Sequence, residues 1–325
     1  MELLWNFEIN ITLFFQALGD WLKYPLKAFT YLGNEEFYIL IMPAIYWCVS
    51  SIIGVRTGIM LVISGGLNTC LKFLFHSPRP FWIDTRVKAI ISETSFGLPS
   101  GHAQNAASIW GTLAASAKKK WVTILLLIVI LFIGLSRIYL GVHFTRDVLA
   151  GWLVGGLIVW IYFLLEKRVA KWLAPKKLGI QILYVLLFSA SIILLGLLSK
   201  AASANWVMPS LWSETALQTG GEIPDPFNIE GLVTLAGVAF GFLSGFAWWV
   251  KKYGVLIIEG SFSKRFLRYF VGIVGVIIFY LGLKMIFPED PLLLGIILRF
   301  ARYGMIGLWV SALAPALFVK LGINK

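Results

Sequence analysis

The chain has 325 residues, of which 59% are hydrophobic and only 14% are charged, and its mean hydropathy is +0.83. A soluble protein of this length carries far more charge, so the composition excludes a soluble domain and indicates a membrane protein. The formal net charge of +12 is therefore interpreted through membrane topology, and we expect no nucleic-acid partner.

Apolar runs of the length that crosses a bilayer, about 20 residues, recur along the chain. The apolar residues 1–32 are interrupted by Asp20, Lys23 and Pro25, which favours an interfacial helix over a further span. The residues after them predict nine spans, at roughly 37–53, 58–75, 101–117, 122–139, 148–165, 180–198, 231–250, 266–286 and 303–319.

The expected fold is therefore an all-α polytopic membrane bundle of about nine transmembrane helices. We divide it into an interfacial N-terminal helix (1–32), a core of five spans (33–170) and an extension of four spans (171–325). Cys48 and Cys70 lie inside apolar runs, as small core residues do. The N-terminus has no basic n-region, so no removable signal peptide is expected.

The loops between the predicted spans alternate in charge. Lys and Arg gather at 118–120, 167–177 and 251–268, whereas acidic residues gather at 35–36 and 214–230. Because cytoplasmic loops carry the Lys and Arg excess, the first set and the C-terminus are expected in the cytoplasm. The polar motifs described next fall on the opposite, extracytoplasmic or lumenal, side. A bacterial source would make this membrane the cell membrane.

The segment SRIYLGVHFTRD at 136–147 places His143 and Asp147 four residues apart. On a helix, residues i and i+4 face the same way. A carboxylate bonded to one ring nitrogen fixes the tautomer and leaves the other nitrogen free to attack. The pair thus predicts the nucleophile and its orienting group in covalent catalysis, although this spacing is also typical of a simple contact at a helix start.

The segment PSGH at 99–102 precedes an apolar run, so Ser100 is a predicted N-cap, followed by Gly101 and His102 as the first helical residues. Free N–H groups at a helix N-terminus suit an anion, and glycine lets the backbone approach it closely. His102 would then stand beside a bound phosphate as a general acid. A plain helix start with a structural histidine is the alternative interpretation.

Three permanent cations, Lys72, Arg79 and Arg137, lie at the edges of predicted spans. For a single residue of this kind, snorkelling to the interface is the simpler explanation. Three of them together with two histidines indicate a phosphate site, because guanidinium groups match phosphate oxygens and positive charge stabilises the transition state.

The three motifs together resemble the signature of the type 2 phosphatidic acid phosphatase (PAP2) superfamily, which includes the lipid phosphate phosphatases. They read Lys72-x6-Arg79-Pro80, Pro99-Ser100-Gly101-His102 and Ser136-Arg137-x5-His143-x3-Asp147. The number of predicted spans and the C-terminal segment 225–242 are more loosely similar to glucose-6-phosphatase.

The resemblance implies a PAP2-type helical core and a phosphohistidine intermediate. His143 would be the nucleophile, Asp147 would orient it, and His102 would serve as acid and then as base. The resemblance also implies a set of residues that bind the phosphoryl oxygens: Lys72, Arg79, Ser100, Gly101 and Arg137. It implies no metal site and no cofactor.

The sequence favours a metal-independent phosphatase that hydrolyses a lipid phosphate or pyrophosphate at a bilayer. A sugar-phosphate phosphatase, a lipid phosphotransferase and a phosphate-binding transporter are the alternatives. A transporter gains nothing from the His143–Asp147 pair and is the least favoured. The small-residue ladders at Gly151 and Gly155 and at Gly237, Gly241 and Gly245 are typical of close helix packing, within the protein or in a homo-oligomer.

Overall fold

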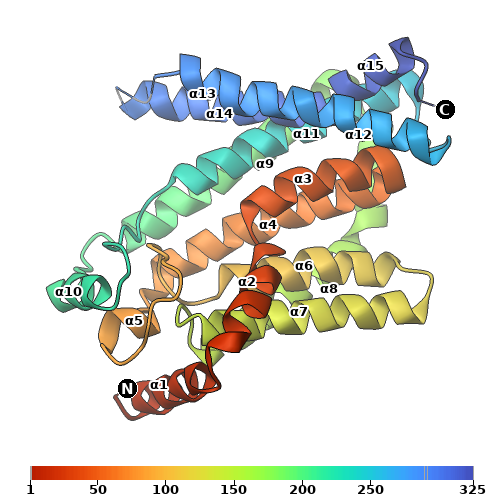
Figure 1. The fold of residues 1–325 in the computed structure, drawn as a ribbon. Helices are drawn as coiled ribbons and strands as arrows, with labels where there is room; N and C mark the ends of the chain where they lie inside the picture. Colours follow the sequence, from red (N-terminus) through yellow and green to blue (C-terminus); the bar gives the residue numbers. More distant parts are fainter. Residues whose placement is uncertain (1, 289, 291, 325) are drawn as a thin grey trace. The chain divides into compact units, whose positions relative to one another are not determined.

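The computed structural model describes residues 2–288, 290 and 292–324, and the regular secondary structure within these residues is entirely helical (Figure 1). The chain forms two compact units. The first comprises Met1–Phe37, Ile63–Ile161 and Gly196–Asn228, and the second comprises Tyr38–Val62, Tyr162–Leu195 and Ile229–Lys325.

The first unit takes its helices from the N-terminal half of the chain and from the segment before α11. They are α1 (Glu2–Ala17), η1 (Asp20–Leu22), α2 (Lys23–Tyr31), the end of α4 (Ser51–Phe75), α5 (Pro80–Ile83), α6 (Gly101–Ser116), α7 (Lys120–Tyr139), most of α8 (Thr145–Leu173), the end of α9 (Leu178–Ala202) and α10 (Ser210–Gln218). Helices α1, α2 and α6 all pack against α7. The interfacial placement of the N-terminal helices stays a prediction.

Close packing in the first unit depends on the glycines of α8. A Cβ atom on Gly155 would lie 2.5 Å from the Gln104 carbonyl oxygen of α6, and one on Gly151 would lie 2.7 Å from the Ser100 carbonyl oxygen. Only glycine allows this approach. The predicted small-residue ladder is therefore confirmed as a helix contact within the protein, and it fixes the start of α6 against the start of α8.

The second unit is dominated by the C-terminal helices. It contains most of α3 (Glu35–Ala44), η2 (Ile45–Val49), α11 (Glu230–Tyr253), α12 (Phe262–Ile277), η3 (Ile278–Gly282), α13 (Leu283–Ile286), α14 (Leu292–Leu308), η4 (Trp309–Leu313) and α15 (Ala314–Lys320). Helix α11 packs along α14, where a Cβ atom on Gly241 would lie 1.8 Å from the Gly304 carbonyl oxygen. The second predicted glycine ladder is thus also a contact within the protein.

Seven helical stretches among the described residues are long and apolar enough to cross a membrane. They are Ser51–Ile83, Lys120–Tyr139, Thr145–Leu173, Leu178–Ala202, Glu230–Tyr253, Phe262–Ile286 and Leu292–Lys320. Each corresponds to one predicted span. The all-α membrane bundle is confirmed, and the count of nine is approximate.

The two other predicted spans are helical but short. Helix α6 has 16 residues. The span predicted at 37–53 covers most of the 10-residue α3 and the 5-residue π-helix η2, and then runs past Ser50 into the start of α4. Its apolar run continues past Ser50, but the backbone there is extended, with φ −161° and ψ 123°. Pro43 inside α3 also lacks the N–H that would continue the helical ladder.

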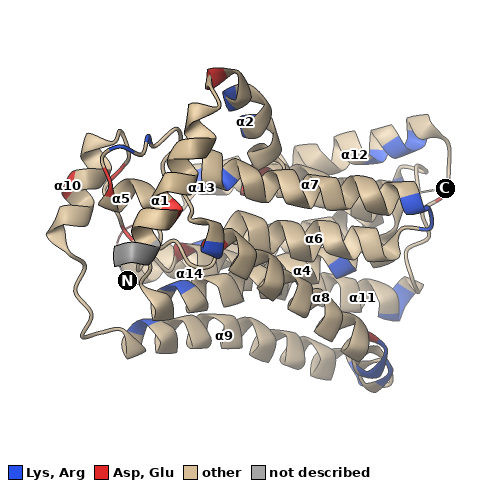
Figure 2. Cartoon of the chain, turned by 90° about the horizontal axis from the view of Figure 1, so that it is seen from below, with Lys and Arg blue, Asp and Glu red and all other residues tan. Residues whose placement is uncertain are grey.

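The outer faces of the long helices are apolar. Leu153 and Trp160 of α8 and Leu187 of α9 are among the exposed large side chains, as expected of helices that contact lipid. Figure 2 shows groups of Lys and Arg residues at one end each of α8, α11 and α12. Lys251 Nζ donates to the Ala174 carbonyl oxygen at 2.8 Å, which joins two of these basic ends. The chain is a multi-pass integral membrane protein.

Candidate active site

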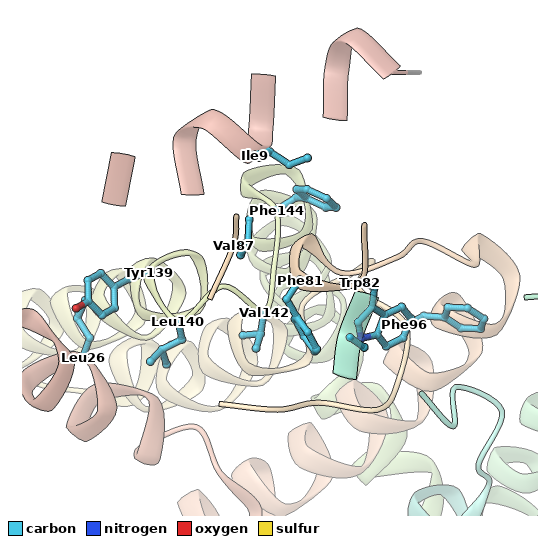
Figure 3. Close-up of a cluster of buried hydrophobic side chains, with 11 residues drawn as sticks. Ile9, Leu26, Phe81, Trp82, Val87, Phe96, Tyr139, Leu140, Val142 and Phe144 are labelled. Atoms are coloured by element: carbon cyan, nitrogen blue, oxygen red, sulfur yellow. The ribbon is translucent and has the colours of Figure 1, made fainter. Parts of the chain in front are cut away.

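A buried apolar cluster in the first unit supports the polar residues of the three motifs (Figure 3). Val142 and Phe144 belong to it and flank His143 in the chain, while Phe96 follows the polar Ser95. Phe81 and Trp82, two and three residues after Arg79, are also completely buried in this cluster. The apolar neighbours thus anchor the backbone on both sides of His143 and on the C-terminal side of Arg79 and Ser95.

The loop between α7 and α8 carries His143, whose side chain is 1% exposed. Its Nδ1 lies 3.4 Å from Asp147 Oδ2, and that oxygen also accepts from the backbone N–H of Phe144 at 3.0 Å. Arg79 Nη1 lies 3.1 Å from His143 Nε2. Because arginine only donates, Nε2 must accept, so the ring proton sits on Nδ1 and points to Asp147.

Arg79 makes hydrogen bonds to two loops of the site. Its Nε donates to the Ser95 carbonyl oxygen at 2.6 Å, and its Nη1 donates to the Val142 carbonyl oxygen at 2.9 Å as well as to His143. Its Nη2 donates to Ser95 Oγ at 3.1 Å and to the Phe96 carbonyl oxygen at 3.3 Å. The guanidinium therefore joins the loop before α6 to the loop before α8.

The PSGH segment begins α6 as the sequence predicts. The Ser100 side chain caps the helix by accepting from the backbone N–H of Ala103, and the Ser100 N–H donates to the Asp147 carbonyl oxygen at 2.9 Å. Asn68 of α4 donates to the Pro99 carbonyl oxygen at 3.1 Å. A Cβ atom on Gly101 would lie 3.1 Å from Asn68 Oδ1, so this turn is held closely against α4.

Lys72 and Arg137 complete the cationic group. Lys72 Nζ donates to Ser95 Oγ at 2.8 Å. Arg137 Nη1 donates to Thr30 Oγ1 at 2.6 Å, and its Nη2 donates to the carboxylate of Glu93. Arg137 Nε is buried and has no hydrogen-bond partner, so this guanidinium keeps an unused donor.

All eight predicted site residues lie in the first unit. Ser95 Oγ accepts hydrogen bonds from both Lys72 and Arg79, and the Asp147 carbonyl oxygen accepts from Ser100. Three further residues join them: Glu93, Thr30 and Asn34. His102 Nε2 lies 2.8 Å from Asn34 Oδ1, and His102 Nδ1 lies 3.9 Å from Glu93 Oε1. No sequence pattern marks these three residues, because each reaches the site only through the tertiary fold.

The electrostatics of the site favour a neutral His143 and an ionised Glu93. Burial, followed by the charges of Arg79, Arg137 and Lys72, holds the pKa of His143 well below its ordinary value of 6.5. Burial raises the pKa of the Glu93 carboxyl, but Arg137 and Arg79 outweigh this effect and hold it below 4.5. The site is thus suited to an anion and to a neutral imidazole nucleophile.

The long segment before α11 supports the site from outside the motifs. The Trp206 ring stacks on His76 with centroids 4.6 Å apart. The Glu222 N–H donates to Ser92 Oγ at 2.8 Å, and the Asp225 N–H donates to the Thr94 carbonyl oxygen at 3.1 Å. The segment therefore holds the Ser92 side chain and the Thr94 backbone, on either side of Glu93.

Groups of three or more His, Cys, Asp or Glu side chains with metal-binding geometry are absent from the part of the chain that the structure describes. The positive charge of the site comes instead from Lys72, Arg79 and Arg137, which are all buried. These groups supply hydrogen-bond donors as well as charge.

Comparison with known proteins gives two family matches. The model described as the PAP2 superfamily matches residues 53–171, and that described as the PAP2 superfamily phosphatase, transmembrane extension, matches residues 233–325. The first match contains all three motifs. The second covers most of the C-terminal helices of the second unit.

Curated relatives and a solved structure are also similar. Phosphatidylglycerophosphatase B of Bacillus subtilis is 31% identical over 157 residues, covering 43% of this chain and 73% of that protein. Human glucose-6-phosphatase 3 is 28% identical over 166 residues, covering 43% of this chain but only 48% of that protein. The crystal structure of a transmembrane PAP2 type phosphatidylglycerolphosphate phosphatase from Bacillus subtilis has a TM-score of 0.46 and 26% identity, covering 52% of this chain and 89% of that one.

Proposed function

Because this chain belongs to the PAP2 superfamily, we propose that it is a membrane phosphatase that hydrolyses a lipid phosphate or pyrophosphate through a phosphohistidine on His143. The observation that carries the proposal is the convergence of Lys72, Arg79 and Arg137 around a neutral histidine with an oriented ring. This arrangement provides both an anion site and a nucleophile.

In the first step, His143 Nε2 attacks the phosphorus atom, and the bond from phosphorus to the ester oxygen breaks. Arg79 Nη1, which donates to Nε2 at 3.1 Å, must then turn its N–H to a phosphoryl oxygen. His102 protonates the departing oxygen. Asp147 accepts from Nδ1 and stabilises the positive charge that forms on the ring.

In the second step, water attacks the phosphohistidine and the N–P bond breaks. His102, now neutral, takes the proton from water, so both histidines return to their starting states. Inorganic phosphate leaves, and Lys72, Arg79, Arg137 and the N-terminus of α6 stabilise the charge on its oxygens throughout. If an acceptor alcohol replaced water, the same site would act as a phosphotransferase.

We place the site on the extracytoplasmic or lumenal side and the C-terminus in the cytoplasm. The support is the Lys and Arg excess at the ends of α8, α11 and α12, which is typical of cytoplasmic loops. The motifs lie at the opposite ends of the predicted spans.

A lipid substrate is favoured over a sugar phosphate. The match with phosphatidylglycerophosphatase B covers 73% of that protein, whose name indicates a lipid substrate. In addition, the exposed apolar helices give a lipid direct access to the membrane side of the protein. Glucose-6-phosphatase 3 motivates the sugar alternative, although less than half of that protein is covered.

The test of substrate class is phosphate release by the purified full-length protein in detergent. The panel contains phosphatidic acid, phosphatidylglycerol phosphate, sphingosine phosphate, undecaprenyl pyrophosphate and glucose-6-phosphate, each with and without EDTA. We expect hydrolysis of one lipid class that EDTA does not reduce, because buried arginine and lysine supply the charge that a metal would otherwise supply. Preference for glucose-6-phosphate would favour the sugar alternative, and release that EDTA abolishes would refute metal independence.

The pH dependence of turnover should reflect the low pKa of His143. The neutral ring is the form that attacks, and its pKa lies below 6.5, so His143 stays competent as the pH falls through 6.5. We therefore expect the acid limb of kcat/KM to lie below this value. An acid limb centred above pH 6.5 in a full kinetic profile would contradict this assignment.

A further inference from the structure

Among the residues that the structure describes, Glu93 is the carboxylate that forms ion pairs with two of the proposed phosphate-binding cations, Arg79 and Arg137. It faces charged or titratable groups from four parts of the first unit: Lys72 of α4, Arg79, His102 of α6 and Arg137 of α7. Arg137 Nη2 donates to Oε1, and Arg79 Nη2 lies 3.7 Å from Oε2. These are the donors that a phosphoryl group would need.

Exposure places Glu93 on the solvent side of this group. The side chains of Arg79 and Arg137 are each 1% exposed, whereas Glu93 is 27% exposed and His102 is 19% exposed. An anion that approaches from solvent therefore meets Glu93 before it reaches the two guanidinium groups.

On the basis of the proposed function, we infer that Glu93 is an internal competitor of the substrate phosphate. Its carboxylate occupies the position between Arg137 and Arg79 and must leave when a phosphate takes these donors. Two anions within hydrogen-bond distance of one guanidinium would repel each other at close range in a buried site, so they exclude each other. Glu93 thereby lowers the affinity for any phosphate and favours release of the product.

The release of Glu93 requires only a side-chain rotation. The residues on either side are held, because the Ser92 side chain accepts through Oγ from the Glu222 N–H and the Thr94 carbonyl oxygen accepts from the Asp225 N–H. Arg79 also holds the two carbonyl groups that follow, those of Ser95 and Phe96. The rotamers of the Glu93 side chain are the remaining freedom, and rotation toward solvent frees both arginines without rearranging the loop.

The charge balance predicts the effect of neutralising Glu93. With its carboxylate, Glu93 is a counter-ion in direct contact with Arg137 and close to Arg79. Without it, the nearest carboxylate is that of Asp147, which pairs with His143 and acts on Lys72 and Arg79 from a greater distance. Glu93→Gln keeps the size of the side chain but removes its charge. We expect this variant to unfold at a lower temperature in the absence of anions and to bind inorganic phosphate about tenfold more tightly, which corresponds to about 1.4 kcal/mol.

The experiment measures thermal unfolding of the full-length protein in detergent over a titration of inorganic phosphate. Asp84→Asn is the matched control, because Asp84 is an acidic residue of the same loop whose partner, Arg86, is exposed. The control should show the phosphate affinity of the wild type. Equal or weaker phosphate binding by Glu93→Gln would overturn the inference, since a merely structural role would lower stability without raising affinity.

Glu93→Asp provides a second variant, because its shorter side chain keeps the charge but pairs less well with Arg137. We expect an intermediate phosphate affinity. If either variant fails to fold alone, saturating phosphate during purification should restore it, and failure of that rescue would also overturn the inference. The assay needs no turnover: a silent lipid panel with tighter binding by Glu93→Gln would refute only the proposed function, and lipid hydrolysis with unchanged phosphate binding would refute only the role of Glu93.

Discussion

Replacing His143 with alanine should reduce phosphate release by about 10⁴-fold or more, because it removes Nε2, the proposed nucleophilic atom. The structure gives this expectation a geometric basis: Nδ1 is bound to Asp147, so the lone pair on Nε2 points at the cationic group. The measurement is phosphate release from the best lipid substrate, combined with acid-quenched trapping of radiolabelled phosphate. Labelled protein should appear with the wild type and not with His143→Ala.

The matched comparison is Asp147→Asn. The carboxylate accepts from the Phe144 N–H and from His143 Nδ1, and an asparagine oxygen keeps both bonds while removing the charge that stabilises the imidazolium. A loss of roughly 10²-fold is expected, with trapped phosphoprotein still detectable. Wild-type activity in His143→Ala, or the same total loss in both variants with intact folding, would contradict these separate roles.

Arg79→Lys is expected to be almost as damaging, although it preserves the charge. Arg79 donates to the carbonyl oxygens of Ser95, Phe96 and Val142 and to His143 Nε2, and a lysine ammonium cannot match this planar set of donors. Each buried carbonyl left unpaired costs about 1–3 kcal/mol. We therefore expect a lower unfolding temperature together with a loss of activity of at least about 10²-fold.

Arg86→Lys is the control for this substitution. Arg86 is exposed and pairs locally with Asp84, so lysine should be tolerated there with an unfolding temperature close to that of the wild type. Thermal unfolding and phosphate release are measured for both variants side by side. Wild-type stability of Arg79→Lys would show that the guanidinium network does not hold the two loops together.

The sequence allowed prediction of those parts of the site that depend on local geometry. Ser100 caps α6 as expected, because an N-cap hydrogen bond joins a side chain to a backbone N–H only three residues further along the chain. His143 and Asp147 face each other because they are four residues apart at a helix start. The charge of Arg79 was also evident from the sequence. Its hydrogen bonds between two loops were not, because they reach carbonyl groups 16 and 63 residues away.

Glu93, Thr30 and Asn34 were missed for the same reason. Thr30 contacts Arg137 across 107 positions of the chain, and Asn34 contacts His102 across 68 positions. Glu93 lies in a loop without periodicity, and the contacts that fix its neighbours come from residues 222 and 225. Hydropathy likewise predicted the long helices correctly, but the span that it predicted at 37–53 runs through the helix break at Ser50. Hydropathy is averaged over many residues, so it does not detect one residue with an extended backbone.

The contacts of α1, α2 and the turn that follows α2 have a consequence for anyone who shortens or tags this protein. The family match begins at residue 53, so trimming the chain to that boundary would keep every signature motif. It would also delete Thr30, which bonds to Arg137, and Asn34, which bonds to His102. The hydrogen bonds from Gln16 to the carbonyl groups of Lys88 and Tyr139 would be lost as well. The segment 16–34 thus helps to hold Arg137, His102 and the loop at Lys88 in place, and affinity tags and fusion partners belong at the other terminus.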